Sequence, residues 1–321
     1  MNYIGIDIGG TNVKMALVSI AGEIIKRSSF KTHGAREPEE VIDEIASEVK
    51  KLAGDVDYLA IGVGCPGAID TAAGIVNYSP NLQWRNVPLA DMLSRKTGKT
   101  VRAANDAACA ALGEHKFGVG KGRFTDTAMI TLGTGVGGGF VVDGKLFQGY
   151  KSMGGEVGHT VIRVNGQQCT CGRKGCFEAY ASATALIRET RKALNGDKNQ
   201  ESMMWDYLGL KRGKRKYDLY SADGRAAFAC AKKGDPIASK VINNYIENLS
   251  AGVINVINTF RSQAVILGGG VCAEETLATR VQAYVDEYRY GGKDSLPAIV
   301  LNATLGNDAG ILGAASLVAD C

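Results

Sequence analysis

The first thirty residues alternate hydrophobic and polar positions, with small turn residues between the alternating stretches. Tyr3–Ile8 is followed by Gly9-Gly10, Thr11–Ile20 by Ala21-Gly22, and Glu23–Phe30 completes the series. A period of two is typical of strands with one buried face, and two glycines suited to positive φ are typical of a hairpin turn. The segment is therefore predicted to form three strands joined by two turns.

The pattern then changes to a helical period. Hydrophobic residues recur every three or four positions in Pro38–Leu52, which predicts an amphipathic helix. Tyr58–Val63 is an apolar stretch typical of a buried strand, and Gly64–Gly67 is predicted to be a loop after it. Thr100–Ala104 is predicted to be a further strand, and Ala107–His115 a helix.

The order of strand, glycine turn, strand and second turn returns near residue 130. Asp126–Leu132 is predicted to be a strand, Gly133–Gly139 a glycine turn, Phe140–Val142 a strand and Asp143-Gly144 a hairpin turn. We interpret this as an internal duplication of a β-hairpin, with one copy in each half of the chain.

The C-terminal part is predicted to be mainly helical from residue 181 to residue 260. Lys211–Lys216 interrupts the helices and is interpreted as a basic, solvated surface segment. Ala264–Leu267 is predicted to be a strand that ends in three glycines, and Asp308–Val318 a closing helix. Helices and strands mixed over 321 residues predict an α/β protein with two domains or two lobes.

Composition argues against several classes of protein. Hydrophobic residues make up 45% of the chain and charged residues 22%, and the net charge of +4 is small for this length. We therefore expect no nucleic-acid partner, and because no apolar stretch reaches transmembrane length we expect no membrane partner. The chain begins directly with a predicted strand instead of a signal segment, so we expect a cytoplasmic protein with reduced thiols.

Glycine is abundant, with 42 residues against 6 prolines, and it clusters at the ends of apolar stretches. Two segments fit the dinucleotide pattern G-x-G-x-x-G, one ending at Gly67 and one at Gly138, but neither precedes the helix that this pattern requires. A phosphate-binding P-loop before Lys99 lacks its first glycine, which is Leu93 here. A nucleotide would therefore have to be bound by hairpin turns.

Tight glycine turns can bind phosphate because successive N–H groups form a concave anion site that no Cβ obstructs. Two such turns in duplicated positions favour this function over a purely structural one. Asp7, at the end of the first strand, would hold Mg²⁺ directly or through water. The candidate phosphate-binding residues are Gly9, Gly10, Thr11, Lys14, Gly133, Thr134 and Gly135.

A candidate catalytic carboxylate follows the strand Thr100–Ala104. Asn105 and Asp106 precede a predicted helix, and either residue is suited to cap its N-terminus. A kinase acting on an alcohol also needs a carboxylate that accepts the hydroxyl proton, and Asp106 would face a cleft between lobes. Capping and catalysis both remain open for Asp106 at this point.

Three of the eight cysteines, Cys169, Cys171 and Cys176, fall within the segment CTCGRKGCFE. His159 precedes Cys169 by ten positions, and one histidine with three cysteines forms a closed tetrahedral set for Zn²⁺. A disulfide would leave one thiol unpaired, and a redox motif usually has the spacing C-x-x-C. We therefore predict a structural zinc site.

The predicted zinc loop carries carboxylates on both sides, Glu156 before it and Glu178 at its end. A rigid loop would hold Glu156, His159 and Glu178 toward one ligand. Polar groups fixed in this way are suited to recognise a polyol.

The segments Asp7–Thr11, Leu132–Gly135 and Leu267–Gly270 resemble the two phosphate motifs and the adenosine motif of the actin, Hsp70 and sugar-kinase superfamily. The resemblance implies a two-lobed actin/Hsp70/hexokinase-like (ribonuclease H-like) ATPase fold, with Gly268, Gly269 and Gly270 near the adenosine. Residues 1–118, with the closing helix 305–321 packed on them, would form the lobe with the sugar side and the first phosphate hairpin. Residues 119–304 would form the lobe with the zinc loop and the adenosine site.

The segment Gly155–His159, followed by Cys169-x-Cys171-Gly172-x-x-Gly175-Cys176-x-Glu178, resembles the signature of the ROK family (repressors, open reading frames, kinases) at every signature position. The resemblance covers the chain from Asp7 to the final helix. It implies an ATP-dependent kinase for the 6-hydroxyl of a hexose, with glucose as the expected substrate, Asp106 as general base, and ATP, Mg²⁺ and structural Zn²⁺ as cofactors. The implied sugar-binding residues are Gly67, Asn81, Asn105, Asp106, Glu156, His159 and Glu178.

Several alternatives remain open at the level of sequence. N-acetylmannosamine, N-acetylglucosamine or allose could replace glucose, although Gly154-Gly155 is similar to glucokinase-like members. A sugar-sensing repressor would carry a winged helix before Asp7, where we expect no room for one. A zinc-stabilised ATP-binding module would not need Asp106. Relatives are often dimers, but no hydrophobic stripe identifies an interface.

Overall fold

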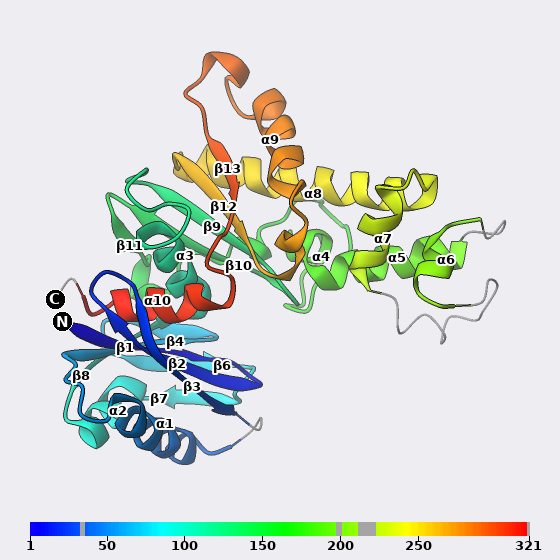
Figure 1. The fold of residues 1–321 in the computed structure, drawn as a ribbon. Helices are drawn as coiled ribbons and strands as arrows, with labels where there is room; N and C mark the ends of the chain where they lie inside the picture. The colour runs from blue at the N-terminus through cyan, green and yellow to red at the C-terminus, as the bar shows by residue number, and fades with distance from the viewer. Residues whose placement is uncertain (33–35, 197–200, 211–222, 320–321) are drawn as a thin grey trace.

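The computed structural model describes residues 1–32, 36–196, 201–210 and 223–319 (Figure 1). The predicted basic loop Lys211–Lys216 lies outside the described residues. Two five-stranded sheets form the centre of the molecule, with helices between them and around them. No helix in the described part of the chain is long and apolar enough to cross a membrane.

The first sheet has the strand order β3-β2-β1-β4-β8. The predicted meander forms its antiparallel part, and β4 and β8 continue it in parallel with β1. Because Asp7 pairs with Gly64 and Gly64 pairs with Ala104, the carboxyl ends of three parallel strands lie at one edge. The strands are β1 (Asn2–Ile8), β2 (Asn12–Ser19), β3 (Ile24–Lys31), β4 (Ala60–Cys65) and β8 (Thr100–Asn105).

The second sheet has the order β11-β10-β9-β12-β13, which repeats the arrangement of the first. Its first three strands are antiparallel and its last two run parallel to β9. The duplicated hairpin predicted from the sequence therefore belongs to two sheets of the same topology. The strands are β9 (Thr127–Leu132), β10 (Val136–Val142), β11 (Lys145–Phe147), β12 (Ala264–Gly268) and β13 (Ile299–Asn302).

Helices cover both faces of the first sheet. Val13 and Leu17 of β2 lie in the core beneath α1 (Pro38–Ala53), whereas Ala16 and Val18 pack in a second cluster with Ile311 of α10 (Ala309–Ser316). The β2 strand is therefore buried on both sides although its sequence alternates. The outer layer is completed by α2 (Leu89–Thr97) and a three-stranded sheet of β5 (Ala68–Asp70), β6 (Ile75–Ser79) and β7 (Trp84–Val87).

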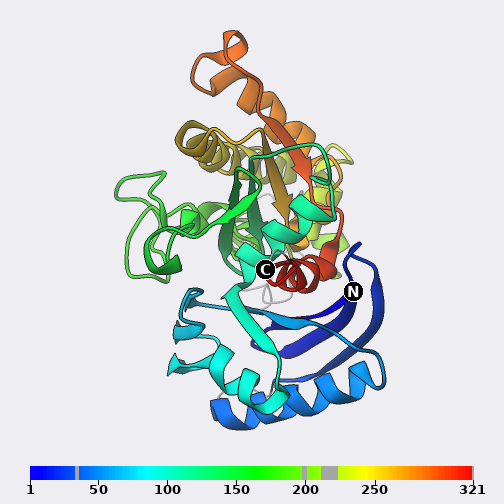
Figure 2. The same cartoon turned by 90° about the vertical axis from the view of Figure 1, so that its left-hand side faces the viewer.

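Two helices, α3 (Asp106–Lys116) and α10 (Ala309–Ser316), lie between the sheets (Figure 2). α10 packs on β1 and β4, and α3 packs on β9 and β10. A Cβ atom on Gly313 would lie 1.6 Å from the carbonyl oxygen of Cys109, so the backbones of the helices touch where they cross. Glycine is therefore required at the crossing.

A buried carboxylate on α3 contacts the two segments of the chain that pass from one sheet to the other. One segment follows α3 and the other precedes α10. Glu114 is 0% exposed and accepts hydrogen bonds from the N–H groups of Val119 (3.1 Å), Thr304 (2.9 Å) and Leu305 (2.6 Å). Buried polar groups of this kind are costly to leave unpaired. Glu114 therefore fastens both connections to α3.

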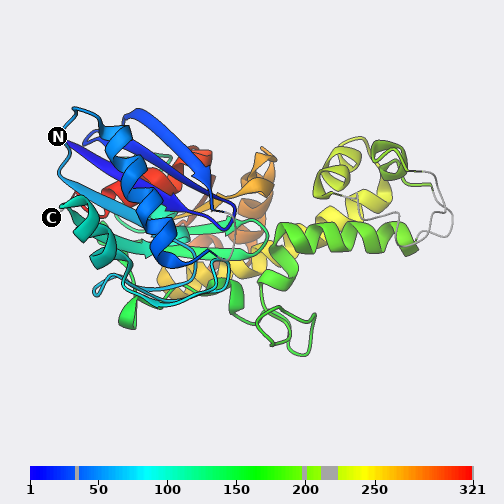
Figure 3. The same cartoon turned by 90° about the horizontal axis from the view of Figure 1, so that it is seen from below.

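The remaining helices surround the second sheet and extend away from it (Figures 1 and 3). The long helix α8 (Pro236–Phe260) runs along this extension in Figure 1. The α-helices are α4 (Glu178–Ala181), α5 (Ala183–Gly196), α6 (Met204–Tyr207), α7 (Gly224–Ala231), α8 (Pro236–Phe260) and α9 (Leu277–Tyr288). The short 3₁₀ helices are η1 (Tyr150–Ser152), η2 (Val157–His159), η4 (Gly270–Ala273), η5 (Gly292–Asp294) and η6 (Gly306–Asp308).

The backbone of the predicted glycine turns does not have the positive φ angles that the sequence pattern suggests. Gly9, Gly10, Gly133 and Gly135 all have φ outside the positive region. The first turn is instead closed by a hydrogen bond of 2.9 Å from the N–H of Gly9 to the carbonyl oxygen of Asn12. The glycines therefore provide access to the backbone, not a left-handed conformation.

Two other glycine segments extend strands. Residues 137–139 belong to β10 and not to a turn. A Cβ atom on Gly139 would lie 2.6 Å from the Cβ atom of Ala111 in α3, so the close approach of this helix requires glycine there. Gly64 belongs to β4, where a Cβ atom would lie 3.3 Å from the Sγ atom of Cys109. Gly64 and Gly139 therefore lie where α3 packs on the two sheets, whereas Gly62 lies against α10, where a Cβ atom would be 1.7 Å from the carbonyl oxygen of Ala314.

Candidate active site

Two carboxylates, Asp7 and Asp106, lie at the carboxyl edge of the first sheet with β4 between their strands. Adjacent strands are about 4.8 Å apart, so their backbones are roughly 10 Å apart. Burial, and then the charge of Asp106, raises the pKa of Asp7 to about 6, while its cross-strand partner Lys14 acts in the opposite direction. Burial also raises the pKa of Asp106. Neighbouring carboxylates with raised pKa values are typical of functional sites.

The capping role that the sequence left open belongs to Asn105. Its Oδ1 atom accepts hydrogen bonds from the N–H groups of Ala107 (2.9 Å) and Ala108 (3.2 Å), and its Nδ2 atom donates to the carbonyl oxygen of Gly67 (3.1 Å). Asp106 is the first residue of α3 and accepts from Ala107 (2.9 Å). Asn105 therefore fixes the end of α3 that carries Asp106.

A cavity of about 120 Å³ lies between the two halves of the molecule and includes Asp106 in its wall. The predicted residues Gly67, Asn105 and Glu156 also line it. Both sheets contribute, since the first half supplies the end of β8 and the second half supplies β10 and the loop after β11. Further lining residues, which the sequence motifs did not indicate, are Thr71, Phe140, Gln148, Ser152 and Met153.

One contact joins the two halves beside this cavity. The N–H group of Thr71, after β5, donates to Ser152 Oγ at 3.2 Å. Ser152 and Lys151 both have positive φ values, of 58° and 50°, which is uncommon for residues other than glycine. No sequence motif marks this loop, and only its position after the second hairpin could have indicated it.

Asn81 lies beside the first glycine hairpin and is absent from the cavity wall. A Cβ atom on Gly10 would lie 3.5 Å from the Cβ atom of Asn81. The hairpin thus brings together Gly9, Gly10, Thr11 and Lys14 near Asp7.

The second hairpin adjoins the glycines that end β12. Gly269 has φ +92°, and a Cβ atom there would lie 2.5 Å from the carbonyl oxygen of Leu132, directly before Gly133. Gly133 donates to the carbonyl oxygen of Gly135 at 3.0 Å and so closes the turn that contains Thr134. The predicted second phosphate motif and the predicted adenosine motif are therefore neighbours.

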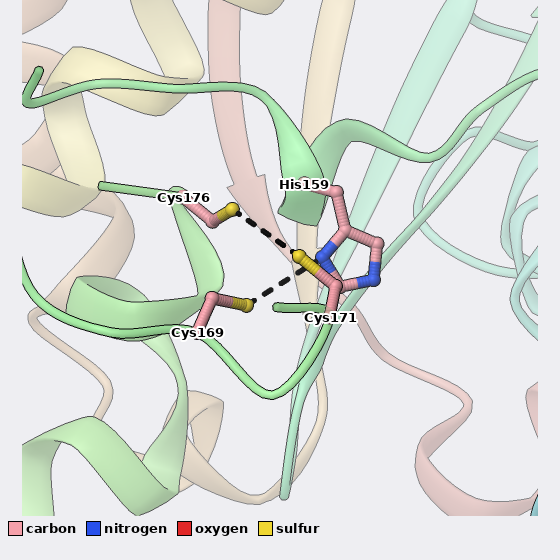
Figure 4. A group of neighbouring side chains, drawn as sticks. All are labelled: His159, Cys169, Cys171 and Cys176. Atoms are coloured by element: carbon pink, nitrogen blue, oxygen red, sulfur yellow. Dashed lines mark hydrogen bonds between the residues drawn. The ribbon is translucent and has the colours of Figure 1, made fainter. Parts of the chain in front are cut away.

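The predicted metal ligands form a compact group (Figure 4). The ligand atoms of His159, Cys169, Cys171 and Cys176 all lie within 4.8 Å of one another. Cys169 Sγ is 3.7 Å from His159 Nδ1, and Cys171 Sγ is 3.6 Å from Cys176 Sγ. Zn–S bonds of about 2.3 Å in a tetrahedron place ligand atoms about 3.8 Å apart, so the group fits a zinc ion.

The charge balance of this group also fits a cation. Burial, followed by the neighbouring thiols, raises the pKa of Cys176 to about 12. Three adjacent thiolates therefore need a positive charge among them. The second ring nitrogen of His159 points away from the thiols (Figure 4).

Glu178 connects the cysteine group with the second hairpin. Its carboxylate accepts a hydrogen bond of 3.1 Å from the N–H of Val136 and one of 3.2 Å from Thr170 Oγ1. A Cβ atom on Gly135 would lie 2.4 Å from its Oε2 atom. His159 and Glu178 do not line the cavity, in contrast to Glu156.

Two sheets of one topology, each with a glycine hairpin, and two carboxylates at the edge of the first sheet define the α/β actin/hexokinase-like fold that the sequence predicted. The chain belongs to the ROK family, whose model ("ROK family") matches residues 3–321. The family resemblance read from the zinc segment is thereby confirmed.

Known proteins are similar to this chain over nearly its full length. A glucokinase of Thermotoga maritima is 37% identical over 99% of this chain and 97% of its own length. An N-acetylmannosamine kinase of Shigella flexneri is 31% identical over 99% and 98%. The structure of a ROK family glucokinase from Streptomyces griseus, in complex with glucose and AMPPNP, is similar with a TM-score of 0.82 and 32% identity over 100% of both chains.

Proposed function

We propose that this protein is an ATP-dependent kinase that transfers the γ-phosphoryl group of ATP to the 6-hydroxyl of glucose. The observation that carries the proposal is the cavity between the two sheets, with Asp106, Gly67 and Glu156 in its wall. The glucokinases of similar sequence and the glucose and AMPPNP complex of the similar structure support both substrates.

Asp106 acts as the general base in this proposal. Its carboxylate accepts the proton of the sugar hydroxyl while the oxygen forms a bond to the γ-phosphorus and the bond to the ADP oxygen breaks. A pKa raised by burial makes Asp106 a better proton acceptor than an exposed aspartate. Asn105 positions it, because the Asn105 side chain bonds both the helix end and Gly67.

Gly67, Asn81, Asn105, Glu156, His159 and Glu178 bind the sugar in this proposal. The positions of Gly67, Asn105 and Glu156 in the cavity wall support their role in sugar binding. His159 and Glu178 would reach the sugar from the cysteine loop, and Asn81 from the side of the first hairpin. The phosphates of ATP would be bound by the N–H groups of both hairpins, and the adenosine near Gly268, Gly269 and Gly270.

We infer two metal ions. A structural zinc ion would be held by His159, Cys169, Cys171 and Cys176, and their spacing and burial support it. Asp7 would hold Mg²⁺ directly or through water, which its position beside a second carboxylate supports. Bound Mg²⁺ would neutralise charge on the phosphates of ATP.

We also retain three proposals from the sequence. Residues 1–118 with 305–321 would form one lobe and residues 119–304 the other, which the packing of α10 on β1 and β4 supports. The protein would act in the cytoplasm, and it would be a homodimer, which sedimentation velocity would test.

N-acetylmannosamine is the second candidate substrate, because a kinase named for that sugar is similar to the chain over its whole length. A coupled ADP-release assay with glucose, mannose, N-acetylmannosamine, N-acetylglucosamine and allose separates the candidates. A kcat/KM highest for glucose is expected. A higher value for an N-acetylated sugar would replace glucose in the proposal.

Asp106→Asn tests the assigned base. We expect kcat to fall by about 10²–10⁴, the usual contribution of a general base, with glucose binding retained in calorimetry. Asp91→Asn, an exposed residue on α2, is the matched control and should leave kcat unchanged. An Asp106→Asn protein with wild-type kcat would contradict the proposal.

A further inference from the structure

A backbone carbonyl oxygen of each glycine hairpin accepts a hydrogen bond from the hydroxyl group of a threonine outside the hairpin, and no sequence motif indicated either threonine. Thr32 lies directly after β3, and its Oγ1 atom donates to the carbonyl oxygen of Gly9 at 2.7 Å. Thr184 lies in the first turn of α5, and its Oγ1 atom donates to the carbonyl oxygen of Thr134 at 2.7 Å. The two hairpins thus receive the same kind of hydrogen bond from unrelated segments.

A backbone hydrogen bond accompanies each of these hydroxyl bonds. The N–H group of Thr32 donates to the carbonyl oxygen of Thr11 at 2.9 Å. At the second hairpin, the N–H group of Ala183 donates to the carbonyl oxygen of Gly133 at 2.8 Å. Two carbonyl groups of each hairpin are therefore directed toward a neighbouring segment.

The N–H groups of the same peptides are directed the other way. In a planar trans peptide the C=O of one residue and the N–H of the next point in opposite directions. A bond to the carbonyl of Gly9 therefore turns the N–H of Gly10 toward the opposite side, and a bond to the carbonyl of Thr134 does the same for the N–H of Gly135. Among the described residues, neither N–H group donates to a protein acceptor.

The orientation of these peptide groups has to be fixed by hydrogen bonds because they lie next to glycine. A peptide next to glycine can rotate with little steric cost, and the opposite orientation would present a carbonyl oxygen to an anion. A hydroxyl that holds the carbonyl outward removes that alternative.

We propose that Thr32 and Thr184 are positioning residues, whose hydroxyl groups orient the Gly9–Gly10 and Thr134–Gly135 peptides so that their N–H groups face the phosphates of ATP. The inference rests on the proposed function, because it takes the hairpins as the phosphate sites. Thr32 is 1% exposed, whereas Thr184 is exposed, so the bond of Thr32 competes less with water. Loss of the Thr32 hydroxyl therefore has the larger effect.

Replacement by valine removes each hydroxyl and retains the shape of the side chain. Thr32→Val is expected to raise KM for ATP about fivefold to tenfold, and Thr184→Val about twofold to threefold, in line with the loss of one hydrogen bond. KM for glucose is expected to stay within a factor of two of the wild-type value. Thr32→Ser keeps the hydroxyl and should restore KM for ATP.

Thr190 provides a matched control. It is 0% exposed, and its hydroxyl donates to the carbonyl oxygen of Leu186 at 2.8 Å, far along α5 from the hairpin. Thr190→Val should lower the free energy of unfolding in urea and leave KM for ATP unchanged. A purely structural role for Thr32 would make Thr32→Val behave like Thr190→Val.

Two kinds of failure are distinguishable. A wild-type protein that releases no ADP with any sugar would remove the proposed function, whereas calorimetry with AMPPNP alone would still measure nucleotide binding in the variants. Unchanged ATP affinity in both Thr32→Val and Thr184→Val, or an equal rise of KM for glucose, would overturn the inference. Weaker AMPPNP binding that Thr32→Ser restores would support it.

Discussion

Replacement of Asp7 by asparagine is predicted to stabilise the ligand-free protein, and to do so more strongly as the pH rises. Asp7 has a pKa of about 6 in the folded protein, against 3.8 for an unperturbed aspartate. A difference of about two pKa units corresponds to about 3 kcal/mol, which is the cost of keeping this carboxylate ionised where it lies. Asp7→Asn removes that cost and keeps the size of the side chain.

The sign of the effect follows from proton binding. Because the pKa of Asp7 is raised, the folded state binds this proton more tightly than the unfolded state between about pH 4 and pH 6. The wild-type protein therefore loses stability as the pH rises through this window, and the loss is complete above it. The advantage of Asp7→Asn should grow from about 1 kcal/mol at pH 4.5 to about 3 kcal/mol at pH 8.

Urea unfolding of both proteins at pH 4.5 and pH 8, without nucleotide or Mg²⁺, measures this difference. Asp308→Asn is a control of opposite sign, because its hydrogen bond with Arg27 lowers the pKa of Asp308. The Asp308 variant should therefore lose stability at pH 8 and approach the wild-type protein at low pH. If the gap between Asp7→Asn and the wild type were the same at both pH values, or if the variant were less stable at pH 8, the electrostatic account of Asp7 would be refuted.

The other predictions concern metal and packing. Cys171→Ser should reduce bound zinc from about one ion per chain to a small fraction, and it should lower Tm. Metal analysis and calorimetry of one sample would measure both quantities. Full zinc content in the variant would exclude Cys171 as a ligand. Glu114→Gln should lower the free energy of unfolding by about 2–4 kcal/mol, because an amide has one acceptor oxygen for three N–H groups; a loss below about 0.5 kcal/mol would show that water replaces the carboxylate.

The elements that the sequence predicted well are those with a periodic pattern or a fixed ligand spacing. The strands of both hairpins and the helix at Pro38 follow from periodicity, because one buried face imposes it. The cysteine group was predictable because metal ligands need particular residue types at close spacing, and Cys169, Cys171 and Cys176 do lie together with His159.

The remaining features depend on contacts between segments far apart in the chain. The small sheet of β5, β6 and β7 was missed because its strands are short and irregular. The prediction of a turn at residues 137–139 is wrong because nothing in the local sequence indicates that α3 packs on β10 there. Thr32 and Ser152 belong to no motif, and only the folded chain shows that one contacts Gly9 and the other Thr71.

The crossing of α3 and α10 limits how the two sheets can move relative to each other, because α10 packs on the first sheet and α3 on the second. Backbone touches backbone at Gly313, with no layer of side chains between the helices that could be compressed or rearranged. Sliding of one helix along the other would drive carbonyl groups into Cα atoms, so rotation about the point of contact is the movement that the packing permits. The two sheets therefore share a pivot at Cys109, about one helical turn from Asp106 at the start of α3, and a few degrees of rotation there would change the distance between Asp106 and the second hairpin.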